Sequence, residues 1–243
     1  MTDTAIADLC EVNPKHPAGI EDDEEVAFVG MADLDDVSAI ASDTEQRPFG
    51  EVKKGYKPFM DGDILMAKIT PCFENCKIGQ AQISTPIAAG STEFHVMRPG
   101  DELDRRYLLH FLRQPWVLEL GELRMTGSGG QRRVPERILD ELKIPLPPIE
   151  EQRRIAAVLD AADDLRTKRR QALAKLDTLT QAIFIDMFGD HSTTVPFGTL
   201  IEDFRYGTSG KSARDGAPAL RIPNVIGGEV DYGEIKRVPV TDD

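Results

Sequence analysis

The sequence predicts an α+β fold in which one mixed α/β domain is followed by a long coiled-coil-type helix and by part of a second domain. Three observations predict it. Short apolar runs broken by glycine and proline fill residues 1–147, apolar residues recur at spacings of three and four over residues 148–190, and strand-like runs return in residues 191–243. We divide the chain into three segments at these bounds.

The first segment contains several strand signals and one clear helix signal. The runs VAFVGM (26–31), DILMAKI (63–69) and EFHVMRP (93–99) are short, apolar and bounded by turn residues, as strands are. Asp104 is a good N-cap for a helix over RRYLLHFLR, and this helix should stop or bend at Pro115.

The second segment predicts a single helix with a sharp start and a sharp stop. Pro147 and Pro148 are tolerated only at or before its first turn. Glu150 and Glu151 follow at once, where carboxylates favour the positive end of the helix dipole. Gly189 is suited to end the helix in a left-handed cap.

The apolar residues of this helix form a seam like those by which helices pair in coiled coils. With Arg169 as the one break, they recur at alternating spacings of three and four: Ile155, Val158, Ala162, Leu165, Ala172, Leu176, Leu179 and Ile183. At about 1.5 Å per residue, a helix from Ile149 to Phe188 spans roughly 60 Å. We expect a spacer and docking surface, with a long helix in an ordinary bundle as the alternative.

The charge of the chain is unevenly distributed. The net charge of −13 argues against a protein that holds nucleic acid by itself. Residues 1–46 carry thirteen acidic residues and one basic residue, however, whereas residues 47–149 carry thirteen acidic and fifteen basic residues. The middle of the chain is therefore free to present a positive face, and DNA binding through it should be weak without the charges of a partner.

Cysteine content and hydropathy predict the cellular compartment of the protein. No apolar run approaches the length of a membrane span, and Met1–Glu25 is too acidic for a signal peptide. The three cysteines, Cys10, Cys72 and Cys76, are an odd number without a disulfide framework. These features predict a cytoplasmic protein with no membrane partner.

The catalytic and metal-binding motifs are weak. Glu51 and Lys53 have the local shape of a magnesium-dependent nuclease site, but such a pattern arises by chance among 71 charged residues. Cys72, Cys76 and His95 lack a fourth zinc ligand. We predict no catalytic residue and no metal site.

A nucleotide-binding loop is also not predicted. GTSGKS (207–212) resembles the end of a phosphate-binding loop, but Arg205 stands where that motif requires its first glycine. No strand–loop–helix pattern surrounds it.

Basic residues near an aromatic residue and on a glycine-rich loop are the candidates for DNA contact. Arginine can read guanine and glutamine can read adenine through paired hydrogen bonds in the major groove, and lysines can serve phosphates. The candidates are Lys53, Lys54, Tyr56 and Lys57 in one cluster, Gln131, Arg132 and Arg133 on the loop, and Lys68 and Lys77 for phosphates. For any single one of them, the alternative is solvated surface charge.

Four stretches of the chain resemble one protein family. LPPIEEQRRIAAVLDAADDLRTKRRQALAKLDTLTQAIFIDMFGD looks like the central conserved region of type I restriction–modification specificity subunits. AKITPCFEN and GSTEFHVMRPG resemble segments of a target recognition domain in that family, and GSGGQRRVPERILDELKIPLPP is similar to the usual exit from one. YGTSGKSARDGAPALRIPNVIGGEV resembles the opening of a second recognition domain.

The resemblance implies a non-catalytic DNA sequence-recognition subunit that reads half of a bipartite double-stranded target. Methylation subunits would dock on the long helix and use S-adenosylmethionine to methylate a flipped adenine at N6. A restriction subunit would add ATP- and Mg-dependent translocation and cleavage. No cofactor is expected on this chain.

Two departures from the family pattern bear on these expectations. The sequence ends inside the second recognition domain, which predicts either a truncated product or a half-subunit that pairs with a second copy of itself. Cys76 stands where related domains often have glycine, which affects the loop that presents Lys77. The alternative function is a coiled-coil adaptor that binds only protein, and the third is a nuclease using Glu51 and Lys53.

Overall fold

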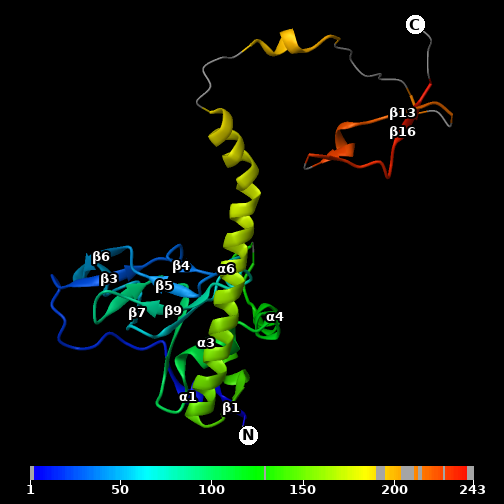
Figure 1. The fold of residues 1–243 in the computed structure, drawn as a ribbon. Helices are drawn as coiled ribbons and strands as arrows, with labels where there is room; N and C mark the ends of the chain where they lie inside the picture. The colour runs from blue at the N-terminus through cyan, green and yellow to red at the C-terminus, as the bar shows by residue number, and fades with distance from the viewer. Residues whose placement is uncertain are drawn as a thin grey trace. The chain divides into compact units, whose positions relative to one another are not determined.

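The computed structural model divides into two compact units, Met1–Thr178 and Leu179–Asp243. The predicted mixed α/β fold with one long helix is confirmed (Figure 1). The structure describes residues 3–128, 130–189, 195–203, 211–212, 215–226 and 228–239.

The first unit contains a six-stranded sheet. Its neighbouring strands are antiparallel except for β9 and β5, which run parallel. The order across the sheet is β2 (Cys10–Val12), β11 (Phe94–Pro99), β8 (Ile64–Ala67), β9 (Ile78–Gln82), β5 (Ile40–Ser42) and β4 (Leu34–Asp35).

A four-stranded sheet packs against the six-stranded one. Within it β10 runs parallel to β3, and the other neighbours are antiparallel. Its order is β6 (Glu45–Pro48), β3 (Glu25–Val29), β10 (Ala88–Gly90) and β7 (Lys57–Phe59), and the short α2 (Phe49–Val52) follows β6.

Both faces of the six-stranded sheet are buried. Ile64 and Met66 of β8 lie in one core with α3 (Arg105–Leu112) and α4 (Pro115–Arg124). Leu65 points to the opposite face, where it joins a second core with the four-stranded sheet. Because side chains alternate along a strand, a strand covered on both faces must be apolar throughout, which explains the run ILMA.

The helices α3 and α4 begin at signals that the sequence carries. The Asp104 carboxylate accepts hydrogen bonds from the main-chain N–H groups of Arg106 and Tyr107, both at 3.0 Å, so the predicted N-cap is confirmed. Pro115 does not merely stop α3 but opens α4, because the first position of a helix has no main-chain hydrogen bond for proline to lose.

The start of the chain pairs with the exit of the first domain. β1 (Asp3–Ala5) is antiparallel to β12 (Lys143–Pro145), and α1 (Ile6–Leu9) contacts α5 (Ile138–Glu141). Figure 1 shows β1 and α1 beside the first turns of α6 (Ile149–Phe188). This pairing ties the two ends of the domain together where the long helix begins.

The helix α6 is one element of 40 residues, as predicted, and it starts directly after Pro148. Gly189 follows it, but the left-handed cap is wrong, because Gly189 does not have a positive φ. Its N–H donates to the carbonyl of Ile185 at 2.6 Å and thereby continues the helical hydrogen-bond pattern. No helix in the described part of the chain is both long and apolar enough to span a membrane.

Beyond the end of α6, the described residues of the second unit form short elements. Two antiparallel pairs join β13 (Ala217–Ala219) to β16 (Lys236–Val238) and β14 (Val225–Ile226) to β15 (Glu229–Val230). The turns η1 (Phe197–Leu200) and η2 (Ile222–Asn224) precede the strands β13 and β14. Most of GTSGKS lies outside the described residues.

If residues 191–243 begin a second copy of the first domain, η1 is the element that corresponds to α1. The sequence aligns with itself at an offset of 191 residues, at which Leu9 falls on Leu200 and Glu11 on Glu202. At that offset α1 (Ile6–Leu9) falls on η1 (Phe197–Leu200), and both are single helical turns. That coincidence supports a partial repeat, which stays a prediction.

Candidate nucleic-acid interface

The glycine-rich loop between Thr126 and Arg133 is closed at its base. The main-chain groups of these two residues exchange hydrogen bonds of 2.9 and 2.8 Å. Gly127 and Gly130 have φ of 116° and 76°, values that favour glycine. Gly129 lies outside the described residues. The loop is therefore a hairpin-like projection with a fixed base.

The segment Lys68–Thr70, which follows β8, holds the tip of this loop. The Thr70 hydroxyl donates to the carbonyl of Gly130 at 2.7 Å and accepts from the N–H of Arg132 at 3.2 Å. The main-chain N–H of Thr70 donates to the carbonyl of Arg132 at 3.0 Å. The loop with Gln131, Arg132 and Arg133 and the segment with Lys68, both predicted to contact DNA, are therefore adjacent although they are distant in sequence.

Both arginines of the loop pair with carboxylates. Arg132 Nη2 donates to Glu74 Oε1 at 3.0 Å. Arg133 makes a two-pronged pair with Glu93, with Nε at 3.0 Å from each oxygen and Nη2 at 2.7 Å from Oε1. The hydrogen bonds from Arg133 lower the pKa of Glu93, and the same bonds raise the pKa of Arg133.

Lys57, Lys68 and Arg133 share one electrostatic environment. Burial lowers the pKa of Lys68, and repulsion from Lys57 and Arg133 lowers it further, whereas attraction to Glu93 raises it. Glu93 thus lies between Arg133 and Lys68, and Lys57 and Glu136 lie close enough to Lys68 to affect its pKa.

His95 lies beneath the loop, and its Nε2 donates to the carbonyl of Val134 at 2.9 Å. The ring is 4% exposed, and its Nδ1 has no hydrogen-bond partner among the described residues. Burial lowers the pKa of His95 below the ordinary 6.5, although the bond to Val134 acts in the opposite direction. The lowered pKa of His95 favours the neutral ring, which binds the carbonyl of the residue that directly follows the loop.

Acid should destabilise the first unit partly through His95. Because the unfolded state binds this proton more readily, stability present above pH 6.5 is lost as the pH falls from that value toward the lowered pKa. His95→Gln keeps an amide donor for Val134 and cannot titrate. Urea unfolding at about pH 7.5 and about pH 5.5 should show a smaller pH-dependent loss in the variant than in the wild type. Equal losses would contradict this role.

The other predicted cluster is split by the structure. Lys53 Nζ pairs with both carboxylate oxygens of Asp22 at 2.7 Å. Tyr56 packs edge-on against Phe28, with ring centroids 5.1 Å apart. The guanidinium of Arg47 stacks over the same Phe28 ring, with Cζ 3.7 Å from its centroid. Arg47 therefore lies next to Tyr56, although the sequence did not predict it as a candidate. No spacing pattern marks Arg47, because its aromatic partner lies on a different strand.

Two further candidates, Lys54 and Gln131, are exposed, and their side chains make no hydrogen bond or ion pair with any residue the structure describes. Lys77 is engaged, because its Nζ donates to the carbonyl of Met31 at 2.8 Å. Cys76 has a φ of 54°, so the turn before Lys77 keeps a glycine-like conformation. The DNA contacts of all these residues stay predictions.

Across the described ranges, no group of three or more histidine, cysteine, aspartate or glutamate residues is placed to hold a metal ion. The thiols of Cys10, Cys72 and Cys76 are free.

Comparison with known proteins decides the family. The model of the type I restriction modification DNA specificity domain matches residues 1–176. The chain belongs to the type I restriction–modification DNA specificity family. The specificity subunits of the EcoEI and EcoAI type I restriction enzymes of Escherichia coli are 39% and 38% identical to it over 181 and 186 residues. These matches cover 73% and 74% of the chain but only 30% and 31% of each relative.

Solved structures of the type I specificity family share the fold. The HsdS subunit from Thermoanaerobacter tengcongensis matches with a TM-score of 0.57 at 22% identity, over 81% of this chain and 52% of that one. A chain from a structure on complex assembly and conformational transition of the type I R-M system matches with a TM-score of 0.51 at 26% identity. That match covers 75% of this chain and 44% of the other.

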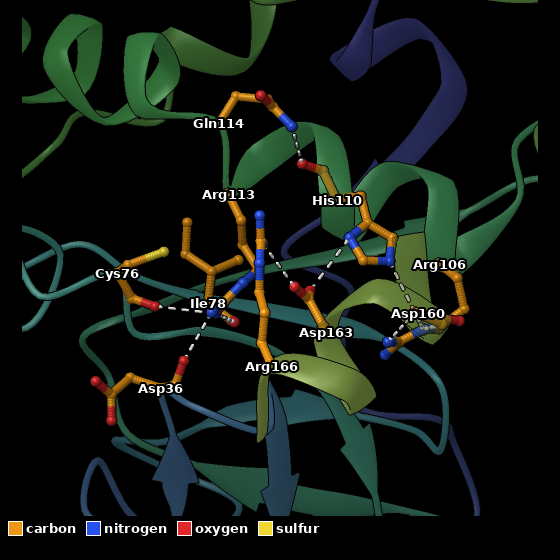
Figure 2. A network of polar contacts seen from close by, with 10 residues as sticks. All are labelled: Asp36, Cys76, Ile78, Arg106, His110, Arg113, Gln114, Asp160, Asp163 and Arg166. Carbon is orange, nitrogen blue, oxygen red and sulfur yellow. Dashed lines mark hydrogen bonds and ion pairs between the residues drawn. The ribbon is translucent and has the colours of Figure 1, made fainter. Parts of the chain in front are cut away.

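In this member of the specificity family, α6 is fixed to the recognition domain by polar contacts with α3. His110 Nε2 lies 2.7 Å from Asp160 Oδ1, and Arg106 also pairs with Asp160 (Figure 2). Burial tends to raise the pKa of Asp160, but the hydrogen bonds from Arg106 and His110 outweigh it and lower that pKa. The helix is thereby oriented on the domain.

The predicted seam of α6 divides between covered and exposed positions. Ile155 and Ala162 are half-buried near the domain. Ala172 is exposed, as are the larger seam residues Val158, Leu165, Leu176, Leu179 and Ile183. An apolar face of this length is unusual on a helix that has no partner.

Proposed function

We propose that the first domain reads one half of a bipartite double-stranded DNA sequence on behalf of a type I restriction–modification complex. The observation that carries this is the loop Thr126–Arg133, whose base is closed by main-chain hydrogen bonds and whose tip, with Gln131 and Arg132, is held by Thr70, two residues after Lys68. Side chains held on a rigid support are suited to base reading, because little conformational freedom is lost on binding. Membership of the specificity family supports the assignment.

We also infer that α6 docks other chains. Its exposed apolar seam would pair with a second helix, from this subunit or from a second copy, and would receive methylation subunits. S-adenosylmethionine, ATP and Mg²⁺ would be held by the methylation and restriction subunits, and this chain would carry out no chemistry. At roughly 60 Å, the helix would separate half-sites by one to two turns of DNA.

DNA selection at several salt concentrations tests this function. The chain, copurified with its methylation subunit, is offered a pool of random duplexes. We expect enrichment of one sequence, and an affinity that falls steeply and linearly with salt on logarithmic axes. Lys57→Ala should reduce the salt slope by about 1 if Lys57 contacts a phosphate. Lys143→Ala, an exposed lysine of the β1–β12 sheet, is the matched control.

The coiled-coil adaptor predicts a different result. The exposed seam would suit it equally well, and such a protein would copurify with its partner without enriching any DNA sequence. Salt-insensitive binding or the absence of an enriched sequence would therefore replace DNA reading with that function.

A further inference from the structure

The two adjacent arginines of the loop are held in different ways. Successive side chains of extended backbone point to opposite sides, and Arg132 and Arg133 accordingly reach different carboxylates. Glu74 belongs to the turn that follows Thr70, whereas Glu93 precedes β11. Each arginine can therefore be considered separately.

All three side-chain nitrogens of Arg133 are engaged. Nε and Nη2 form the fork with Glu93, and Nη1 donates to the carbonyl of Gln131 at 3.3 Å. A two-pronged pair with a carboxylate is the strongest arrangement available to an arginine. To read a DNA base, the Arg133 side chain would have to give up both its fork with Glu93 and its bond to Gln131.

Arg132 is held by a single bond. Only Nη2 is used, on Glu74, and Nε and Nη1 have no hydrogen-bond partner among the described residues. The two side chains of this pair are 47% and 33% exposed, little more than the 42% and 23% of the Arg133–Glu93 pair, so the smaller number of hydrogen bonds makes the Arg132 pair the weaker one. Arg132 can therefore exchange its carboxylate for another acceptor at little cost.

The turn that carries Glu74 is itself fixed. The N–H of Asn75 donates to the carbonyl of Pro71 at 2.9 Å, and the N–H of Lys77 donates to that of Cys72 at 3.0 Å. The backbone that carries the Glu74 carboxylate is thus fixed beside the tip of the loop. The carboxylate holds Arg132 in the free protein and would oppose an approaching phosphate.

We propose that the two arginines have divided roles in the DNA recognition proposed above. Arg133 and Glu93 are positioning residues that fix the loop. Arg132 is the residue that contacts DNA, and it leaves Glu74 for an acceptor there: a guanine edge, in which case it determines specificity, or a phosphate, in which case it adds affinity. Glu74 is the competitor that this exchange displaces.

A matched pair of charge-removing variants tests the division. Glu74→Gln and Glu93→Gln each remove one negative charge beside one arginine of the same loop. A purely electrostatic effect would tighten DNA binding in both variants, because both remove repulsion. Divided roles predict opposite signs. Glu74→Gln should tighten binding several-fold, and Glu93→Gln should weaken binding to the selected sequence about tenfold.

Affinity is measured with the full chain bound to its methylation subunit, on the selected duplex and on an unrelated one, at several salt concentrations. Arg132→Ala should reduce the ratio of the two affinities about tenfold if Arg132 reads a base. It should instead lower the salt slope by about 1 if the acceptor is a phosphate. Thermal melting verifies that each variant is folded, and Arg133→Lys, which keeps the charge but not the fork, should behave as Glu93→Gln does.

Two outcomes would overturn this inference while the proposed function stands. One is a wild type that binds selectively while Glu74→Gln and Glu93→Gln shift its affinity in the same direction. The other is an Arg132→Ala variant with wild-type selectivity and salt slope. A wild type that selects no sequence would overturn the proposed function and the division of roles together.

Discussion

Replacing Gln152 with leucine is expected to lower the free energy of unfolding of the first unit by about 3 kcal/mol or more. The Gln152 side chain is fully buried where α6 meets the domain. Its carbonyl accepts from the N–H of Asp104 at 2.9 Å, and its amide donates to the carbonyls of Glu102 and Pro147 at 2.8 and 2.9 Å. Leucine leaves three main-chain groups unpaired, one buried and two part-buried. At about 1–3 kcal/mol for a buried group, and near the lower limit for the part-buried ones, the sum is about 3 kcal/mol or more.

Urea unfolding followed by circular dichroism measures this loss. Gln171→Leu is the matched control, since Gln171 is exposed on the same helix. The control should change stability by no more than about 0.5 kcal/mol. A Gln152→Leu protein as stable as the control would show that α6 is held to the domain by other contacts.

Replacing Phe73 with alanine is expected to cost about 3–5 kcal/mol. The ring is fully buried and packs directly on the main chain of α4, because a Cβ placed on Gly121 would lie 2.2 Å from Phe73 Cζ. Alanine would leave a cavity that the sheet and the two flanking helices are too rigid to close. The same change would remove the support under the turn that carries Glu74.

The same unfolding assay, with Phe197→Ala as the control, measures the effect of Phe73→Ala. Phe197 is 76% exposed in the second unit, so its removal should change stability little. A Phe73→Ala protein that unfolds at the wild-type urea concentration would mean that this core closes around the cavity.

The helices whose starts are marked by an N-cap residue or by proline could be predicted from the sequence. Asp104 marks the start of α3, and Pro148 with the following glutamates marks the start of α6, because caps and proline act within one helical turn. The order of the strands could not be predicted. The buried run ILMA carries no alternation that shows which face meets which layer, and the parallel pairs join strands far apart in the chain.

The candidate site was predictable in its residue types and not in its geometry. Arg132 and Arg133 stand out on a glycine-rich loop, but their partners Glu74 and Glu93 lie 58 and 40 residues away. Only the folded sheet brings these carboxylates to the loop. For the same reason, the sequence predicts the same role for both arginines, whereas their hydrogen bonds in the structure differ.

The most direct test of DNA reading by this domain is a map of methylated adenines in cells that express the chain with its methylation subunit. For the wild type, we predict methylation at one defined sequence. For Arg132→Ala, we predict that one base position of that sequence becomes degenerate, or, if Arg132 holds a phosphate, that methylation of the same sequence becomes weaker. Identical positions and levels of methylation in both strains would contradict the assignment of Arg132, and methylation that follows no sequence in the wild type would contradict DNA reading by this domain.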